Sequence, residues 1–113
     1  MDCIFCKIAA GSVPAEILYQ DEDLISFRDI NPQAPVHLLI VPRKHIANLN
    51  DLSDDDSYLV GKMAKTAKQL ALSEGISEQG YRLVLNCGDW GGQLVQHIHM
   101  HVIGGRRLDD RLG

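Results

Sequence analysis

The segment from Gln96 to Ile103 constrains this chain most, because histidine alternates there with apolar residues. Residues 97, 99 and 101 are histidines, and residues 98, 100 and 102 are isoleucine, methionine and valine. Side chains of a β-strand point to alternate faces with a period of two. The segment is therefore predicted to be a strand, with the histidines sharing one face and the apolar side chains sharing the other.

Apolar patterns elsewhere predict four more strands and a short first helix. The strands are expected over residues 17–20, 24–28, 36–41 and 81–87. The short helix is expected to run through Ile8 and Ala9, and Gly11 is expected to end it. Two prolines, Pro32 and Pro35, exclude a helix from the loop before the third of these strands.

A long helix is expected to begin within residues 52–56 and to end at Gly75. Ser53 can cap its first turn, and three consecutive aspartates favour the positive end of the helix dipole. We therefore predict an α+β fold: a mainly antiparallel five-stranded sheet with one long helix and a short N-terminal helix. A chain of 113 residues is expected to form a single domain over residues 1–113.

Charge and hydropathy exclude several classes of partner. The net charge is −4, and no basic tract is present, so binding to a nucleic acid polymer is not expected. A small anionic ligand remains compatible with this charge, because one local site can be positive. No apolar run approaches the roughly 20 residues that span a bilayer, and the N-terminus does not resemble a secretory signal. The predicted location is the cytoplasm, without a membrane partner.

The three alternating histidines favour two kinds of chemistry over ordinary surface packing. Histidine is the commonest metal ligand, and a His-x-His pair on a strand can hold zinc. Imidazole is also a good nucleophile near its ordinary pKa of about 6.5, and a neighbouring imidazole can stabilise charge or move a proton. Residues 86–95 precede the histidines, and Gly91 and Gly92 there let backbone N–H groups approach a phosphate. This loop favours the nucleophilic interpretation.

The run from His97 to Ile103 resembles the signature of the histidine triad (HIT) family. The Gly91-Gly92-Gln93 sequence, the segment 29–37 and the start at residues 5–8 resemble the Hint branch of that family. The similarity extends from about Asp2 to Arg106, which is nearly the whole chain. The resemblance implies an HIT-like fold and a homodimer formed through the long helix and a sheet edge.

The resemblance also implies a role for each histidine of the site. His99 would be the nucleophile that forms a nucleotidyl-imidazole intermediate, and His101 would contact the phosphate and its leaving group. His97 and His37 would support this array through hydrogen bonds. Asp29 would accept hydrogen bonds from the ribose hydroxyls, which suits a carboxylate.

Further residues would bind the nucleotide by the same resemblance. An apolar slot for the base would be lined by Phe5, Val13, Phe27 and Ile30, although composition alone would place these residues in an ordinary core. The phosphate would be held by Asn86, Gly92 and the backbone of Gln93, Leu94 and Val95.

The sequence departs from the family pattern in three places. Leu94 stands where a serine or threonine usually helps to bind the phosphate, and Gln96 stands where an aromatic residue is common. The tail over residues 106–113 lacks the Trp-Pro-Pro-Gly ending of the branch. These differences concern the choice of substrate more than the chemistry.

Cys3 and Cys6 have a spacing found in zinc sites, although one Cys-x-x-Cys pair is weak evidence. Some bacterial HIT proteins complete such a site with two histidines, which here would be His45 and His97. The zinc would be structural, because protein ligands would fill all four positions. The alternative is a pair of reduced cysteines packed at the start of a short helix. Cys87 stands alone.

The predicted function is hydrolysis of the P–N bond of purine nucleoside phosphoramidates, which are derivatives of AMP or GMP, without a metal cofactor for the chemistry. A dinucleoside polyphosphate hydrolase of the same family is one alternative. A zinc metallohydrolase with His97, His99 and His101 as ligands is a second, and a non-catalytic nucleotide-binding protein is a third.

Overall fold

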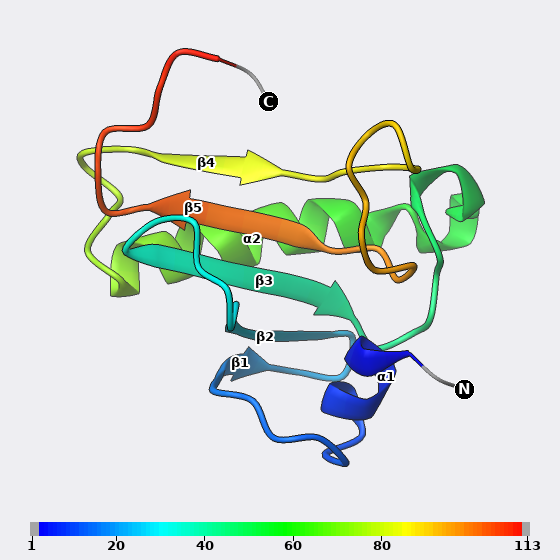
Figure 1. Cartoon of the computed structure of the whole chain (residues 1–113). Coiled ribbons are helices and arrows are strands. Elements are labelled where there is room, and N and C mark those ends of the chain that lie inside the picture. The colour runs from blue at the N-terminus through cyan, green and yellow to red at the C-terminus, as the bar shows by residue number, and fades with distance from the viewer. Residues whose placement is uncertain (1–2, 112–113) are drawn as a thin grey trace.

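The computed structural model describes residues 3–111 (Figure 1). The elements in chain order are α1 (Ile4–Ala9), β1 (Ile17–Gln20), β2 (Leu24–Arg28), β3 (Val36–Pro42), the 3-10 turns η1 (Leu49–Asp51) and η2 (Asp54–Asp56), α2 (Tyr58–Ser73), β4 (Tyr81–Val84) and β5 (Met100–Gly104). The five strands form one sheet in the order β1-β2-β3-β5-β4, and every neighbouring pair is antiparallel. The predicted fold class is confirmed.

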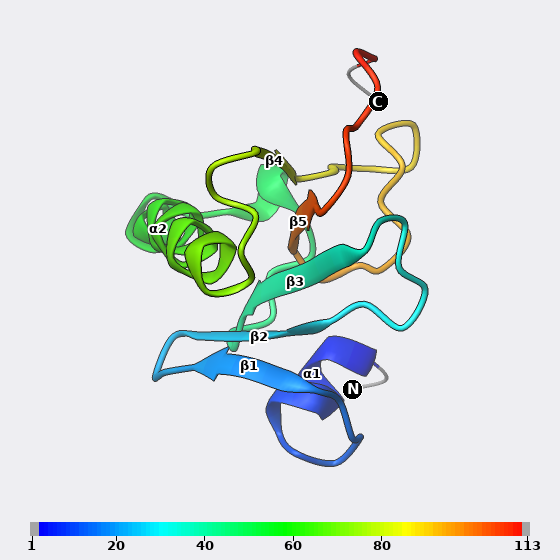
Figure 2. The same ribbon diagram turned by 90° about the vertical axis from the view of Figure 1, so that its left-hand side faces the viewer.

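The two helices lie against opposite faces of the sheet (Figure 2). On the α2 face, Met63 and Ala67 of the helix pack with Leu38 and Val102 of the sheet. On the other face, Phe5 of α1 packs in a smaller cluster with residues of β2 and β3. Along each strand these residues alternate with the residues that face α2. Each buried strand therefore has an apolar side chain at nearly every position, as expected when both faces are covered.

The long helix begins later than the sequence predicts. Residues 54–56 form the 3-10 turn η2, and α2 starts only at Tyr58. The Ser53 side chain makes no capping bond to the backbone, because its hydroxyl donates to the Asp56 carboxylate at 3.3 Å. Asp56 also accepts a hydrogen bond from Lys44 Nζ at 2.6 Å, so the acidic run is used in contacts outside the helix. The helix ends at Ser73, and Gly75 follows with a φ of +75°.

The predicted strands over residues 81–87 and 96–103 are both longer than the observed ones. β4 ends at Val84, and β5 begins at Met100 and continues to Gly104. Before Met100 the chain leaves the ladder, because the Ile98 N–H donates to the carbonyl of Ile46 at 2.7 Å. The alternation of faces nevertheless holds, since the three apolar residues 98, 100 and 102 all lie in the core beneath α2.

Within the described chain, no helix combines the length and apolar character needed to cross a membrane.

Candidate functional site

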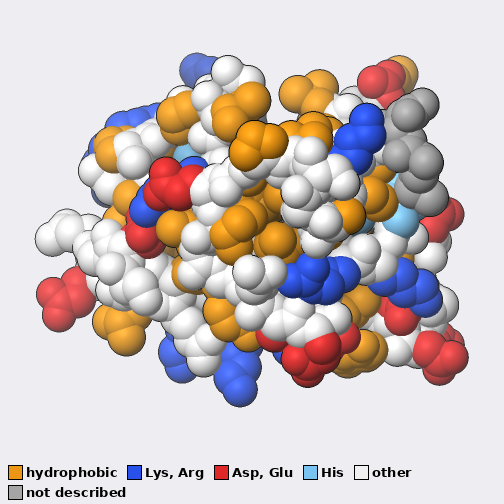
Figure 3. All heavy atoms as spheres, turned by 90° about the horizontal axis from the view of Figure 1, so that it is seen from below, with side chains coloured by type: hydrophobic (Ala, Val, Ile, Leu, Met, Phe, Trp, Pro, Cys, Tyr) orange, Lys and Arg blue, Asp and Glu red, His pale blue; other side chains and the backbone are white. Residues whose placement is uncertain are grey.

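A cavity of about 510 Å³ lies on the α1 face of the sheet. Its polar wall carries three histidines and one carboxylate, namely His37, His99, His101 and Asp29. Its apolar wall includes Ile4, Phe5, Ile8, Val13, Ala15, Phe27, Leu39 and Val95. Seen from the side of β1 and α1, apolar side chains form a band across the surface, with charged groups mainly around it (Figure 3). The cavity therefore suits a ligand with one apolar part and one polar part.

One hydrogen bond and one ring contact fix how His99 is presented to this cavity. Its Nδ1 lies 2.7 Å from the backbone carbonyl oxygen of His97. A carbonyl can only accept, so Nδ1 carries the proton and the Nε2 of a neutral ring keeps its lone pair. The Phe5 and His99 rings pack in a T-shaped arrangement with centroids 5.1 Å apart. Orientation and tautomer together leave Nε2 as the atom available for chemistry.

His101 is held by a second chain of hydrogen bonds. The backbone N–H of Gln33 donates to His37 Nδ1 at 3.0 Å, and His37 Nε2 lies 2.9 Å from His101 Nδ1. Because Gln33 occupies His37 Nδ1 as a donor, the proton of His37 lies on Nε2 and points at His101. His101 Nδ1 therefore accepts, and its own proton lies on Nε2. The site thus pairs a lone pair on His99 with an N–H donor on His101, whose ring centroids are 5.0 Å apart.

Burial keeps these supporting histidines neutral. The pKa of His101 is lowered to about 4, mainly by burial and also by the neighbouring His99 and His37, against the opposing effect of Asp29. Burial also lowers the pKa of His37, with Asp29 again acting in the opposite direction. Neutral rings of His37 and His101 are consistent with these hydrogen bonds, because each ring uses its Nδ1 as an acceptor. His37 Nδ1 accepts from Gln33, and His101 Nδ1 accepts from His37.

Asp29 lies next to His37, at the end of this series of hydrogen-bonded groups, and it also faces the cavity. Its Oδ2 is 3.4 Å from His37 Nε2, and its Oδ1 accepts the N–H of Asn31 at 2.8 Å. The carboxylate is thus oriented by its own loop and retains lone pairs that can accept hydrogen bonds from a ligand.

The four residues predicted to form the apolar slot, Phe5, Val13, Phe27 and Ile30, all line the cavity. Phe5 and Phe27 are buried with ring centroids 5.5 Å apart, and Val13 packs against the same cluster. Ile30 differs from them in being 90% exposed.

The glycine-rich loop also contributes residues to the cavity. Asn86, Gly92, Leu94 and Val95 line it, with Gly92 at a φ of +84°. The Gln93 side chain instead points into the protein, where its amide nitrogen donates to two backbone carbonyls and its oxygen accepts the N–H of Gly88. Gln93 therefore holds the shape of the loop.

Two large apolar side chains of this loop are exposed to solvent. Leu94 is 92% exposed at the cavity mouth, and Trp90 is fully exposed. Asn86 Nδ2 donates to the carbonyl of Gly91 at 2.7 Å and closes the loop between them.

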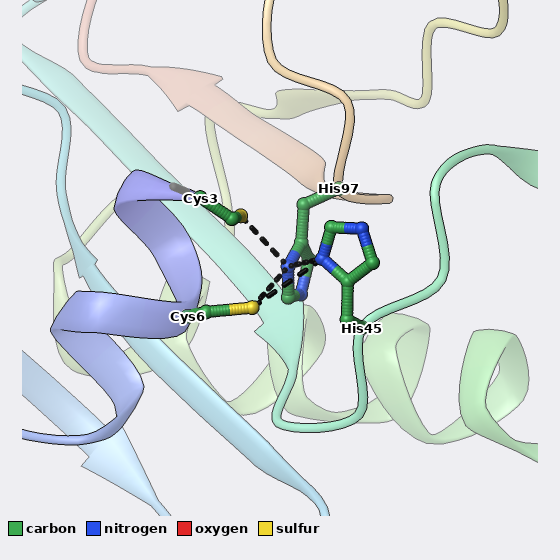
Figure 4. A group of neighbouring side chains, drawn as sticks. All are labelled: Cys3, Cys6, His45 and His97. Carbon is green, nitrogen blue, oxygen red and sulfur yellow. Dashed lines mark hydrogen bonds between the residues drawn. The ribbon is translucent and has the colours of Figure 1, made fainter. Parts of the chain in front are cut away.

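A second polar group lies beside the cavity and brings together Cys3, Cys6, His45 and His97 (Figure 4). Cys3 Sγ lies 3.3 Å from His97 Nδ1, Cys6 Sγ lies 3.3 Å from His45 Nδ1, and the two Nδ1 atoms are 3.2 Å apart. His97 is fully buried, and its Nε2 donates to the carbonyl of Pro42 at 2.8 Å. That bond directs the Nδ1 lone pair of His97 toward the two cysteines.

These four side chains fit a tetrahedral metal ion. With Zn–N near 2.0–2.1 Å and Zn–S near 2.3 Å, the edges of a tetrahedron measure about 3.3–3.8 Å. Cys6 Sγ and His97 Nδ1 are 3.6 Å apart, and the three separations given above are close to this range. Burial and the adjacent Cys3 raise the pKa of the Cys6 thiol, so a cation is needed before both sulfurs ionise.

The three alternating histidines do not form one ligand set. Over residues 3–111, two groups bring metal-ligating atoms within 4.8 Å of one another: the cysteine–histidine group and a group of Asp29, His37 and His101. His97 belongs to the first and His101 to the second, whereas His99 belongs to neither. The atoms of His37 and His101 that meet in the second group already share a hydrogen bond.

Two backbone groups of the site have no signal in the sequence. The Pro42 carbonyl orients His97, and the Gln33 N–H orients His37. Every residue has a carbonyl and nearly every residue has an N–H, so only the fold shows which of these groups bond to the histidine rings.

Comparisons with protein-family models and with individual proteins both find relatives of this chain. Residues 2–109 match the family described as scavenger mRNA decapping enzyme C-term binding. The chain is 47% identical over 111 residues to a purine nucleoside phosphoramidase of Escherichia coli, covering 98% of this chain and 93% of that protein.

Solved structures give the same result. A HIT family hydrolase from Legionella pneumophila superposes with a TM-score of 0.95 at 54% identity, covering 99% of this chain and all of that chain. A Zn-bound histidine triad family protein from Mycobacterium smegmatis superposes with a TM-score of 0.83 at 33% identity, covering all of this chain and 81% of that chain.

Protonation of His101 is expected to destabilise the fold in acid. Its pKa is about 4 in the folded protein and about 6.5 in an unfolded chain, so between these values the unfolded chain binds more protons. Stability is therefore greatest above about pH 6.5 and falls as the pH drops toward 4, by at most about 1.4 kcal/mol per pH unit from this residue. Urea unfolding at successive pH values measures the slope. A His101→Gln variant should flatten it, and an unchanged slope would contradict the assignment.

Proposed function

The chain belongs to the histidine triad family and is a hydrolase, and from this premise we propose that it cleaves the P–N bond of purine nucleoside phosphoramidates. The observation that carries the proposal is the opposed polarity of two adjacent rings in the cavity. His99 presents a lone pair at Nε2, and His101 presents an N–H donor. A phosphoryl group between them would meet a nucleophile on one side and a hydrogen-bond donor on the other.

In the first step, His99 Nε2 attacks the α-phosphorus and a new N–P bond forms. The P–N bond to the amine breaks, its electron pair leaves with the nitrogen, and water supplies the proton that completes the amine. The Nδ1–H of His99 donates to the His97 carbonyl throughout, which stabilises the positive charge that develops on the ring.

In the second step, the hydroxide equivalent left by that water attacks phosphorus and displaces His99. The nucleoside monophosphate and the neutral imidazole are the products. His101 donates from Nε2 to a phosphoryl oxygen in both steps, and it does so as a neutral ring because His37 donates to its Nδ1.

The cavity walls supply the binding contacts. The purine base would lie against Phe5, Phe27 and Val13, and the ribose hydroxyls would donate to Asp29. The loop that contains Asn86 and Gly92 would contact the phosphate, while the Gln93 side chain keeps that loop in place. Leu94 offers no hydroxyl to the leaving group.

Turnover of a fluorogenic adenosine phosphoramidate tests the nucleophile. His99→Asn should reduce kcat by about a thousandfold or more, because covalent catalysis is lost. Wild-type turnover should persist with a chelator at temperatures well below unfolding. Leu49→Ala, a change at an exposed position of η1, should match the wild type.

Three outcomes would overturn this mechanism or substrate. Loss of turnover with chelator in a folded protein would favour a catalytic metal. Faster turnover of a dinucleoside polyphosphate would reassign the substrate within the family. Nucleotide binding without turnover in either protein would favour a binding function.

We further propose that Cys3, Cys6, His45 and His97 hold a structural zinc ion. The support is the tetrahedral spacing of four donor atoms and the carbonyl bond that presets His97. An ion bound there would join α1 to the segment that leads into β5, and α1 carries Phe5 of the cavity wall.

Metal analysis tests this site. Wild-type protein should carry about one zinc per chain, and Cys6→Ser should carry much less, with a melting temperature lower by about 5 °C or more. Cys87→Ser is the matched control and should keep both the metal and the melting temperature. Equal metal content in the two variants would contradict the proposal.

We also propose a homodimer formed through α2 and the edge strand β4. Leu83 of β4 lies opposite Val102 and so on the face that α2 covers, yet it is 39% exposed. The outer side of β4 is a sheet edge, which offers unpaired backbone groups. In analytical ultracentrifugation Leu83→Asp should sediment as a monomer. Leu49→Asp, at a position of similar exposure on η1, should remain a dimer, and a monomeric wild type would refute the proposal.

A further inference from the structure

The segment after β5 reaches back to the loop that controls the histidines. Arg106 Nη2 donates to the backbone carbonyl of Gln33 at 3.0 Å. Gln33 is the residue whose N–H donates to His37 Nδ1. One residue therefore connects the tail of the chain to the hydrogen bonds that end at His101.

The loop over residues 29–35 has little else to hold it. It contains no helix or strand, and Pro32 and Pro35 have no N–H to donate. Its other hydrogen bonds in the described chain do not hold Gln33 from outside the loop: the Asp29 N–H donates to the His37 carbonyl at the start of the loop, the Asn31 N–H donates to Asp29, and Gln33 Nε2 donates to the Asn31 carbonyl. Contacts from outside the loop must therefore set the position of Gln33.

Arg106 is well suited to that task. Its guanidinium is always charged, and a charged donor makes a stronger hydrogen bond to a carbonyl than a neutral donor does. Its Nη1 donates to the Arg107 carbonyl at 3.1 Å, so the side chain is held at two points. The adjacent Gly105 packs closely on the loop as well, since a Cβ there would lie 3.0 Å from Pro35 Cβ.

We propose that Arg106 is a positioning residue for the hydrolytic reaction: by holding the Gln33 backbone, it keeps the Gln33 N–H on His37 and thereby fixes His101 as an N–H donor toward the substrate. This inference rests on the proposed function of the site. Without the Gln33 donor, His37 is free to carry its proton on Nδ1. His101 must then protonate its own Nδ1 and loses the donor at Nε2.

Three variants test the inference by kinetics. Arg106→Gln should lower kcat by about tenfold or more, because the donor to the phosphoryl group is no longer preset, and KM should change much less. Arg106→Lys keeps a charged donor and should recover part of the loss. Arg107→Gln is the matched control, because Arg107 is a neighbouring exposed arginine whose side chain pairs with Asp110. A kcat loss of equal size in Arg107→Gln, or none in Arg106→Gln, would overturn the inference.

The pH profile distinguishes positioning from a general loss of stability. His101 is faced by His99 from its own segment, by His37 from β3 and by Asp29 from the loop. Looser packing of the loop in Arg106→Gln should admit water and move the acidic limb of kcat/KM to higher pH. An acidic limb identical to that of the wild type would contradict the inference.

Histidine ring NMR provides a readout that needs no substrate. Correlation of ring nitrogens with ring protons should assign the Nε2–H tautomer to His37 and His101 in wild-type protein near neutral pH, and a mixture to His37 in Arg106→Gln. If the wild type fails to hydrolyse the phosphoramidate, the proposed function fails, whereas the tautomers still test the link from Arg106. Identical tautomers in wild type and variant would refute that link.

Discussion

The antiparallel register between β3 and β5 determines which histidines meet. Leu39 lies opposite His101, so His37, two residues earlier on β3, reaches His101 diagonally on the same face. A slip of one residue would turn His101 into the core beneath α2. Burial of Met100 and Val102 on the α2 face opposes such a slip. The apolar core on one side of the sheet thus specifies the chemistry on the other.

Two polar networks meet at His97 without sharing atoms. Its side chain points at the two cysteines, while its backbone carbonyl accepts the proton of His99. The Pro42 carbonyl satisfies the remaining ring nitrogen, so a fully buried histidine has partners on both sides. Every buried side-chain nitrogen and oxygen in the described residues has a hydrogen-bond partner. Such satisfied networks are rigid, and rigidity keeps a nucleophile in one orientation.

The local patterns of the sequence predicted the faces of the histidine segment correctly, because a period of two depends only on neighbouring residues. They overestimated the length of that strand, since the bond from Ile98 to the carbonyl of Ile46 comes from a distant part of the chain. The helix start was wrong for a similar reason, because Lys44 engages Asp56. The contacts that orient the site involve backbone atoms, whose identity no residue type encodes. The fold and the candidate residues could be predicted from the sequence. The histidine tautomers could not, because they depend on these backbone contacts.

The position of Trp90 gives the molecule an optical property. It is the only tryptophan of the chain, and it is fully exposed on the loop that contributes Asn86, Gly92, Leu94 and Val95 to the cavity. Indole emission depends on the polarity of its immediate surroundings. The tryptophan fluorescence of the protein therefore originates on a loop that helps to line the cavity, with no contribution from a tryptophan in the core. The chain carries its own reporter on the segment that a phosphate would contact, without an attached dye.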